Sequence, residues 1–181
     1  MWSRNMTRTV TWTLVSAALL STLCLGCSRM FAEAKGTGGA SGRVSDSDES
    51  RNLSIYASME VDDITIANGV NAPSEMPAMM RSDLIAVTAR RGLGNGDNPK
   101  LRLSGEIIHY EDGSKLDAVI GPFEEVVLRA RLIDVQSGAI VQETNLIGRS
   151  KASTSSGVES LSEGVGKALD TWLDNGGIRE S

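Results

Sequence analysis

The sequence predicts a single α+β domain at residues 52–181, with about four antiparallel strands and two helices packed on one face of the sheet. Three observations predict this class. Residues 101–147 contain three stretches in which apolar and polar side chains alternate between turn-forming residues, as in a β-meander. Apolar residues at helical spacing precede these strands near residues 74–91 and follow them near residues 156–175. The expected order of elements is therefore β-α-β-β-β-α.

The first strand is predicted at residues 53–61. Its alternating apolar positions are Leu53, Ile55, Ala57, Met59 and Val61. Asp62 and Asp63 follow directly and offer two neighbouring carboxylates. Adjacent residues of a strand face opposite sides of a sheet, and no further metal-ligand spacing accompanies the pair. We therefore interpret both as solvated loop residues.

The first helix is predicted from Ser74, as its N-cap, to about Arg91. Its apolar stripe is interpreted as core rather than as a methionine-rich binding groove, and it consists of Met76, Met80, Leu84 and Val87. A glycine-rich loop at residues 92–99 follows. Phosphate-binding loops run from a strand into a helix, and this loop has the opposite order. We interpret it as a helix C-cap followed by a turn.

The meander supplies the central strands of the sheet. In its first strand, one face is predicted to pack on the helices and contains Leu101, Leu103, Gly105, Ile107 and His109. The turn at residues 134–138 joins the second strand to the third. The opposite face should meet solvent or a partner, because no third layer is available to cover it; it carries Arg102, Glu106, Arg129 and Arg131.

The second helix is predicted from about Ser156 to Asn175, and Gly176 and Gly177 form its C-terminal cap. Its apolar face shows the strongest periodicity in the chain, through Val158, Leu161, Val165, Ala168, Leu169 and Trp172. This face must pack on the sheet.

Residues 1–26 have the layout of a bacterial secretory signal peptide. Arg4 and Arg8 give a positively charged start, and residues 10–25 form an apolar segment of sixteen residues. A helix that spans a membrane needs roughly 20 predominantly apolar residues. A permanent transmembrane anchor is therefore disfavoured.

The end of this segment resembles the lipobox of bacterial lipoproteins. Gly26 is the small residue before Cys27, whose thiol would accept diacylglycerol, so we expect lipidation of Cys27. The lipobox prefers leucine three residues before the cysteine, whereas this chain has Cys24. The alternative is ordinary cleavage after Ala34, which leaves a mature chain beginning at Lys35.

Residues 27–51 are predicted to be a lipidated N-terminus and a flexible linker, because Gly, Ser, Ala and charged residues dominate without periodicity. The domain at residues 52–181 would then face the periplasm. Ser28 stands where enteric lipoproteins of the inner membrane carry aspartate. That resemblance favours the outer membrane over the inner one.

Charge and residue counts limit the partners and cofactors. The formal charge is −5, and it becomes −7 without residues 1–26, which hold two arginines and no acid. A body of this sign repels nucleic acid and anionic headgroups, so membrane contact should come from the lipid on Cys27. The cysteines are Cys24 and Cys27, and His109 is the sole histidine. We therefore expect no metal site and no cofactor.

The sequence contains no constellation typical of catalysis, so the chain is predicted to be a non-enzymatic binding or assembly module of the cell envelope. Arg129 and Arg131 are the candidate partner-binding residues, because strand spacing points both guanidinium groups the same way, toward carboxylates of an envelope protein or of peptidoglycan. Cross-strand pairing with Glu106 or Glu143 is the alternative explanation.

Two other functions remain open. One is a hydrolase or a carbohydrate- or peptidoglycan-binding protein whose pocket is invisible in the sequence; a cleft lined by His109 and acidic residues would favour it. The other is an oligomeric envelope or secretion component, in which the partner is a second copy of the chain.

One resemblance to a family is carried by three motifs. They are the Gly105–Tyr110 strand that ends at Gly113, the Ile120-Gly121 pair, and the turn at residues 134–138 that closes a long strand. Through these motifs, residues 53–175 resemble small envelope lipoproteins of the domain-of-unknown-function family 4410. The resemblance implies an envelope lipoprotein and no particular activity.

Overall fold

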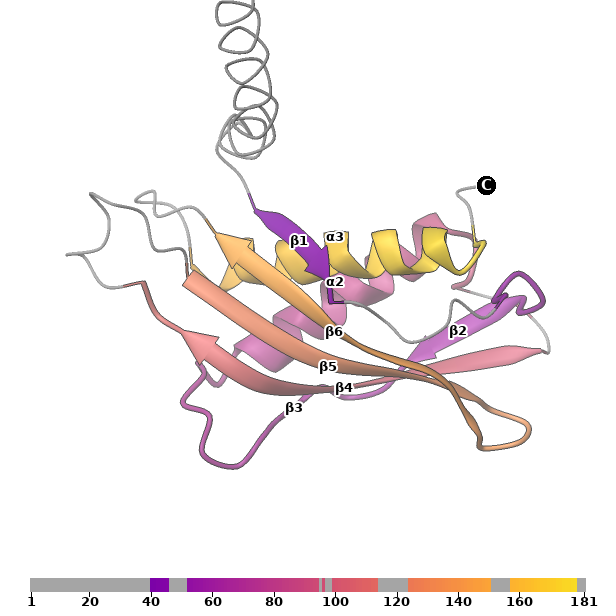
Figure 1. The fold of residues 1–181 in the computed structure, drawn as a ribbon, viewed down its shortest axis with the longest axis horizontal. Coiled ribbons are helices and arrows are strands. Elements are labelled where there is room, and N and C mark those ends of the chain that lie inside the picture. Colours follow the sequence, from indigo (N-terminus) through magenta and orange to yellow (C-terminus); the bar gives the residue numbers. More distant parts are fainter. Residues whose placement is uncertain are drawn as a thin grey trace, which may run out of the picture. The chain divides into compact units, whose positions relative to one another are not determined.

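The protein folds into a curled sheet with two helices against it (Figure 1). The computed structural model describes residues 40–45, 52–94, 96, 99–113, 124–150 and 157–178. The elements are β1 (Ser41–Val44), β2 (Ser58–Val61), β3 (Thr65–Ile66), α2 (Met76–Arg90), β4 (Lys100–Glu111), β5 (Glu124–Asp134), β6 (Ile140–Ser150) and α3 (Val158–Asn175).

The sheet is mixed rather than antiparallel. Its strand order is β1-β6-β5-β4-β2, and β3 also pairs with β4. The long strands β4, β5 and β6 form the predicted antiparallel meander. However, β2 and β3 run parallel to β4, because α2 crosses over between β2 and β4. The predicted α+β class is confirmed, and the prediction of about four antiparallel strands is corrected to a mixed sheet of six strands.

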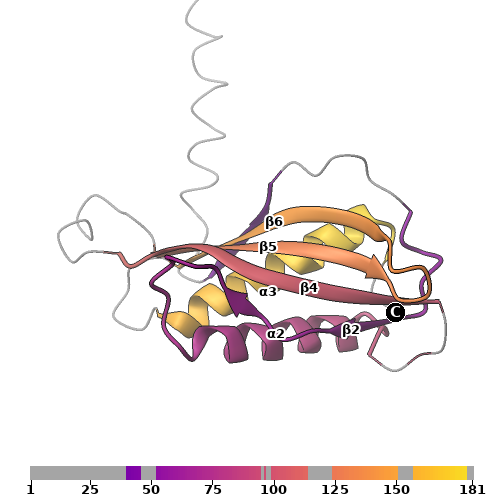
Figure 2. The same ribbon diagram turned by 90° about the horizontal axis from the view of Figure 1, so that it is seen from below.

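Both helices lie on the same face of the sheet (Figure 2). Helix α3 packs on β1, β6 and β5, and α2 packs beside α3 and against β2. The four apolar residues predicted for the stripe of α2 are all buried, as are the apolar residues of α3 from Leu161 to Trp172. Helix α2 begins at Met76 rather than just after Ser74, and its N-cap residue, Glu75, makes no capping side-chain hydrogen bond.

Among the described residues, neither helix is long and apolar enough to cross a membrane.

The alternation of side chains in β4 is interrupted by a bulge. Ile107 pairs with Leu128, but the next pair is His109 with Val127, which leaves Ile108 as an extra residue. The side chain of His109 therefore turns away from the helices and is 49% exposed. The prediction that His109 shares the core face is wrong, because a strict two-residue period does not allow for an inserted residue.

Strand β1 lies within the predicted linker. It pairs with β6 from Ser41 opposite Arg149 to Val44 opposite Leu146, and Ala40 just before it is buried. The prediction of a flexible linker therefore does not hold for residues 41–44. Residues 27–39 and 46–51 of that linker, which include Cys27, and the predicted signal peptide lie outside the described residues.

Three glycines let α3 approach the backbone of β1 and β6. A Cβ added to Gly42 would collide with the carbonyl oxygen of Gly164, and one added to Gly148 would collide with that of Leu161. A Cβ on Gly164 would lie 2.7 Å from the carbonyl oxygen of Ser41. The absence of three side chains thus explains how so short a strand docks on the domain.

Candidate functional site

The first candidate surface is the face of β4, β5 and β6 that points away from the helices, which we call the outer face. In the described part of the chain, both helices lie on the other side of the sheet (Figure 2). The charged residues of the outer face are half-buried or exposed, and they are Lys100, Arg102, Glu106, His109, Glu111, Glu125, Arg129, Arg131, Glu143 and Arg149.

The two candidate partner-binding arginines occupy the central strand, β5. Arg129 stands opposite Glu106 on β4, with 3.5 Å between Nη1 and Oε2. Arg131 stands opposite Glu143 on β6 and donates from Nε to Oε2 at 2.7 Å. The hydrogen bond to Glu143 is the main reason that the pKa of Arg131 is raised above its ordinary value. The cross-strand pairing that the sequence left open as an alternative is therefore present.

These ion pairs leave both arginines accessible. Their side chains are 40% and 44% exposed for Arg129 and Arg131 respectively. A guanidinium group carries five N–H donors, so one glutamate oxygen does not saturate it. Both guanidinium groups therefore remain accessible in the middle of the outer face, that of Arg129 directed toward Glu106 on β4 and that of Arg131 toward Glu143 on β6.

Charges of both signs continue toward the two ends of the outer face. Arg102 donates to Glu60 at 2.7 Å, which is the main cause of its raised pKa, and its Nε lies 3.7 Å from Asp62. At the other end, Arg149 pairs with Glu125 at 2.5 Å. The outer face is therefore a mixed-charge surface rather than a basic patch.

The remaining acidic and histidine candidates are dispersed. His109 lies 4.0 Å from Glu111 on the outer face. Asp63 pairs with Arg81 of α2 at 3.3 Å, whereas Asp62 lies near Arg102, so the two adjacent carboxylates contact different partners. Within the described ranges, no group of three or more His, Cys, Asp or Glu side chains is placed to hold a metal ion.

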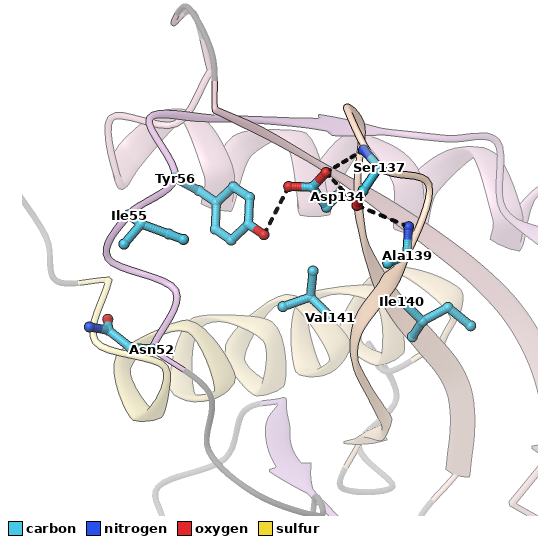
Figure 3. Close-up of a pocket in the computed structure, with 8 residues that line it drawn as sticks. All are labelled: Asn52, Ile55, Tyr56, Asp134, Ser137, Ala139, Ile140 and Val141. Carbon is cyan, nitrogen blue, oxygen red and sulfur yellow. Dashed lines mark hydrogen bonds between the residues drawn. The ribbon is translucent and has the colours of Figure 1, made fainter.

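The second candidate is a shallow pocket of about 270 Å³ that the sequence did not predict (Figure 3). It lies between the segment that precedes β2 and the hairpin that joins β5 to β6. The pocket is lined by Asn52, Ile55, Tyr56, Asp134, Ser137, Ala139, Ile140 and Val141.

Hydrogen bonds to Asp134 form one edge of this pocket. Its carboxylate accepts from the Tyr56 hydroxyl at 3.0 Å, and from the amide and hydroxyl of Ser137 at 2.6 and 2.7 Å. These bonds lower the pKa of Asp134 because they stabilise the charged form, and the bond from the Ser137 amide contributes most. Asp134 is therefore a fixed carboxylate that stays ionised at neutral pH.

Apolar side chains form the rest of the pocket. Ile55 is 63% exposed. Ile140, 51% exposed, stands at the edge with its side chain directed away from Tyr56 (Figure 3), and Ile85 on α2, the other exposed large apolar residue in the described ranges, lies outside the pocket. Residues 53–57, predicted as strand, form a turn in which Asn52 accepts a hydrogen bond from the Ser54 amide at 2.9 Å. This turn moves Ile55 from the predicted core into solvent.

Comparison with known proteins gives only weak similarities. No family model and no curated protein matches the chain, so the resemblance to family 4410 stays a prediction. A PelC dodecamer structure from Paraburkholderia phytofirmans has a TM-score of 0.48 and 16% identity, covering 72% of this chain and 96% of that one. A Xanthomonas campestris protein of the DUF330 family model has a TM-score of 0.44 and 14% identity, with coverages of 69% and 87%.

A minor lipoprotein from Acinetobacter baumannii is similar at a TM-score of 0.41 and 10% identity, covering 66% of this chain and 98% of that one. Similarity at this level, in identity and in TM-score, carries no inference about what this chain does.

Proposed function

We propose that this chain is a lipid-anchored lipoprotein of the bacterial envelope, and that its α+β domain is a non-enzymatic binding or assembly module. The location rests on the signal-peptide layout of residues 1–26 and on the Gly26-Cys27 lipobox. The mode of action rests on one observation. In the described part of the chain both helices lie on the other side of the sheet, and Arg129 and Arg131 are accessible on the central strand of the outer face.

The chemistry of this face suits partners that carry carboxylates. Two guanidinium groups held at strand spacing match carboxylate pairs on an envelope protein or on the stem peptides of peptidoglycan. Surface ion pairs contribute only about 0–1 kcal/mol each. Exchange of Glu106 or Glu143 for a partner's carboxylate would therefore cost the domain little stability.

The position of His109 supports a binding module over a hydrolase. A histidine-dependent hydrolase needs His109 beside an acid or a nucleophile in a cleft. His109 instead lies on the outer face, half-exposed, and is not among the residues that line the pocket. The acid in that pocket is Asp134, which its hydrogen bonds keep ionised and which has no histidine beside it.

A charge swap tests the outer face. Arg131→Glu combined with Glu143→Arg keeps the net charge. It also keeps an ion pair between β5 and β6, with the positions of the cation and the anion exchanged. With a photo-crosslinking residue in place of Val127, the swap is expected to weaken adducts in cells by about tenfold or more, which corresponds to about 1.4 kcal/mol. The thermal midpoint should change little. Adducts of twice the chain mass would identify a second copy as the partner.

The matched control is the same swap at the edge of the outer face, Arg149→Glu with Glu125→Arg, which should leave the adducts intact. A photo-crosslinking residue at Ala86, exposed on α2, reports contacts of the helical side. Equal adduct yields from the wild type and the central swap would contradict a role for Arg131.

A further inference from the structure

We propose that the pocket between residues 52–56 and the β5–β6 hairpin binds an alkylammonium group, with the hydrocarbon on Ile55 and Val141 and the cation beside Asp134. This site is separate from the outer face and does not depend on the function proposed for it. The geometry, the exposed apolar surface and the charge each support it.

The geometry provides two walls from distant parts of the chain. Ile55 and Tyr56 come from the turn before β2, and Val141 comes from the start of β6, where the side chain of its neighbour Ile140 points away from the pocket (Figure 3). The hydrogen bond from Tyr56 to Asp134, at 3.0 Å, ties the two walls together. The space between them has a volume of about 270 Å³.

The apolar wall that precedes β2 is unusually exposed. Ile55 is 63% exposed, although its side chain is large and purely hydrocarbon. Removal of such surface from water is favourable in proportion to the area covered. A hydrocarbon chain in this pocket would contact Ile55 and Val141 at once.

The charge of the pocket selects the sign of the ligand. Asp134 is the one charged residue among its eight lining residues, and none of them is basic. Its carboxylate is already oriented by Tyr56 and Ser137, so a cation gains its attraction without ordering a flexible side chain. The phenol ring of Tyr56 also attracts cations through its π face. An anionic ligand would be repelled.

The same chemistry describes two sources, a lysine side chain of a polypeptide and a free primary amine. Both present a short hydrocarbon chain that ends in an ammonium group. Nα-acetyl-lysine methylamide represents the first source and n-hexylammonium represents the second.

The test is ligand-observed NMR on the mature protein with three probes of equal hydrocarbon length, n-hexylammonium, 1-hexanol and hexanoate. We expect n-hexylammonium to bind at least about tenfold more tightly than 1-hexanol, and hexanoate to show no binding. Binding of acetyl-lysine methylamide comparable to that of n-hexylammonium would indicate a polypeptide lysine; binding of n-hexylammonium without it would indicate a free amine.

Variants locate the site. Asp134→Asn should remove the preference for n-hexylammonium over 1-hexanol, and Ile55→Ser should weaken both probes. Ile85→Ser is the matched control, because it removes an exposed isoleucine elsewhere and should change neither. Equal affinities of the wild type for n-hexylammonium and 1-hexanol would overturn the proposal without recourse to any variant.

Discussion

Replacement of Arg91 by alanine is expected to lower the free energy of unfolding by about 2–4 kcal/mol. The side chain is 2% exposed and lies just after α2. Its Nε donates to Asp170 at 2.8 Å, and its Nη1 donates to Asp174 and to the carbonyl oxygen of Ile178. The hydrogen bonds to the two aspartates, with that to Asp174 contributing most, raise the pKa of Arg91 further above its already high ordinary value.

This loss in the free energy of unfolding is expected because breaking a buried ion pair costs about 3–5 kcal/mol. It is reduced here because Asp170 and Asp174 are 31% and 55% exposed, so water can solvate the carboxylates that remain. Urea denaturation measures the change. Arg91 thus joins the C-terminal ends of both helices.

Arg90 provides the matched control. It is the neighbouring arginine, 60% exposed and 4.0 Å from the same aspartate, Asp170. Arg90→Ala should cost less than about 0.5 kcal/mol, as for other exposed pairs. Arg91→Lys should be intermediate, because it keeps the charge but not the forked donors. Equal losses at positions 90 and 91 would contradict the buried role of Arg91.

Two glycine-to-alanine substitutions in α3 are expected to change stability in opposite directions. Alanine is the better helix former by about 1 kcal/mol, so both substitutions should stabilise an isolated helix. At Gly164, however, the new Cβ would lie 2.7 Å from the Ser41 carbonyl oxygen and 3.0 Å from the Cα of Gly148. Because these are backbone atoms, Gly164→Ala should destabilise the domain by about 1–3 kcal/mol.

Gly166→Ala is the control within the same helix. Its Cβ would lie 3.5 Å from the Val87 side chain and 3.8 Å from that of Asp83, which are ordinary packing distances. We expect a gain of about 0.5–1 kcal/mol. Thermal or urea unfolding of the two variants measures the difference. Stabilisation by both would show that β1 does not pack against α3 at Gly164.

The helices and the meander follow from local periodicity. The apolar stripes of α2 and α3 and the turn at residues 134–138 were predicted because each is encoded by neighbouring residues. The alternation in β5 likewise placed Arg129 and Arg131 on the side away from the helices.

The features that the sequence did not predict depend on contacts between distant residues. Strand β1 carries little alternation, and its docking depends on Gly148 and Gly164, more than 100 residues away. The bulge at Ile108 becomes apparent only when β4 is paired with β5. The pocket required the turn at Ile55 to meet the hairpin at Asp134, 79 positions later.

Mass spectrometry of the mature N-terminus tests most directly whether a lipid on Cys27 anchors the chain in the envelope. We predict a mature chain that begins at a diacylated or triacylated Cys27 and fractionates with membranes. The Cys27→Ala variant should lose both the acyl mass and the membrane association, since two or more acyl chains are needed for stable anchoring. A wild-type chain that begins at Lys35 without acyl mass would contradict this prediction.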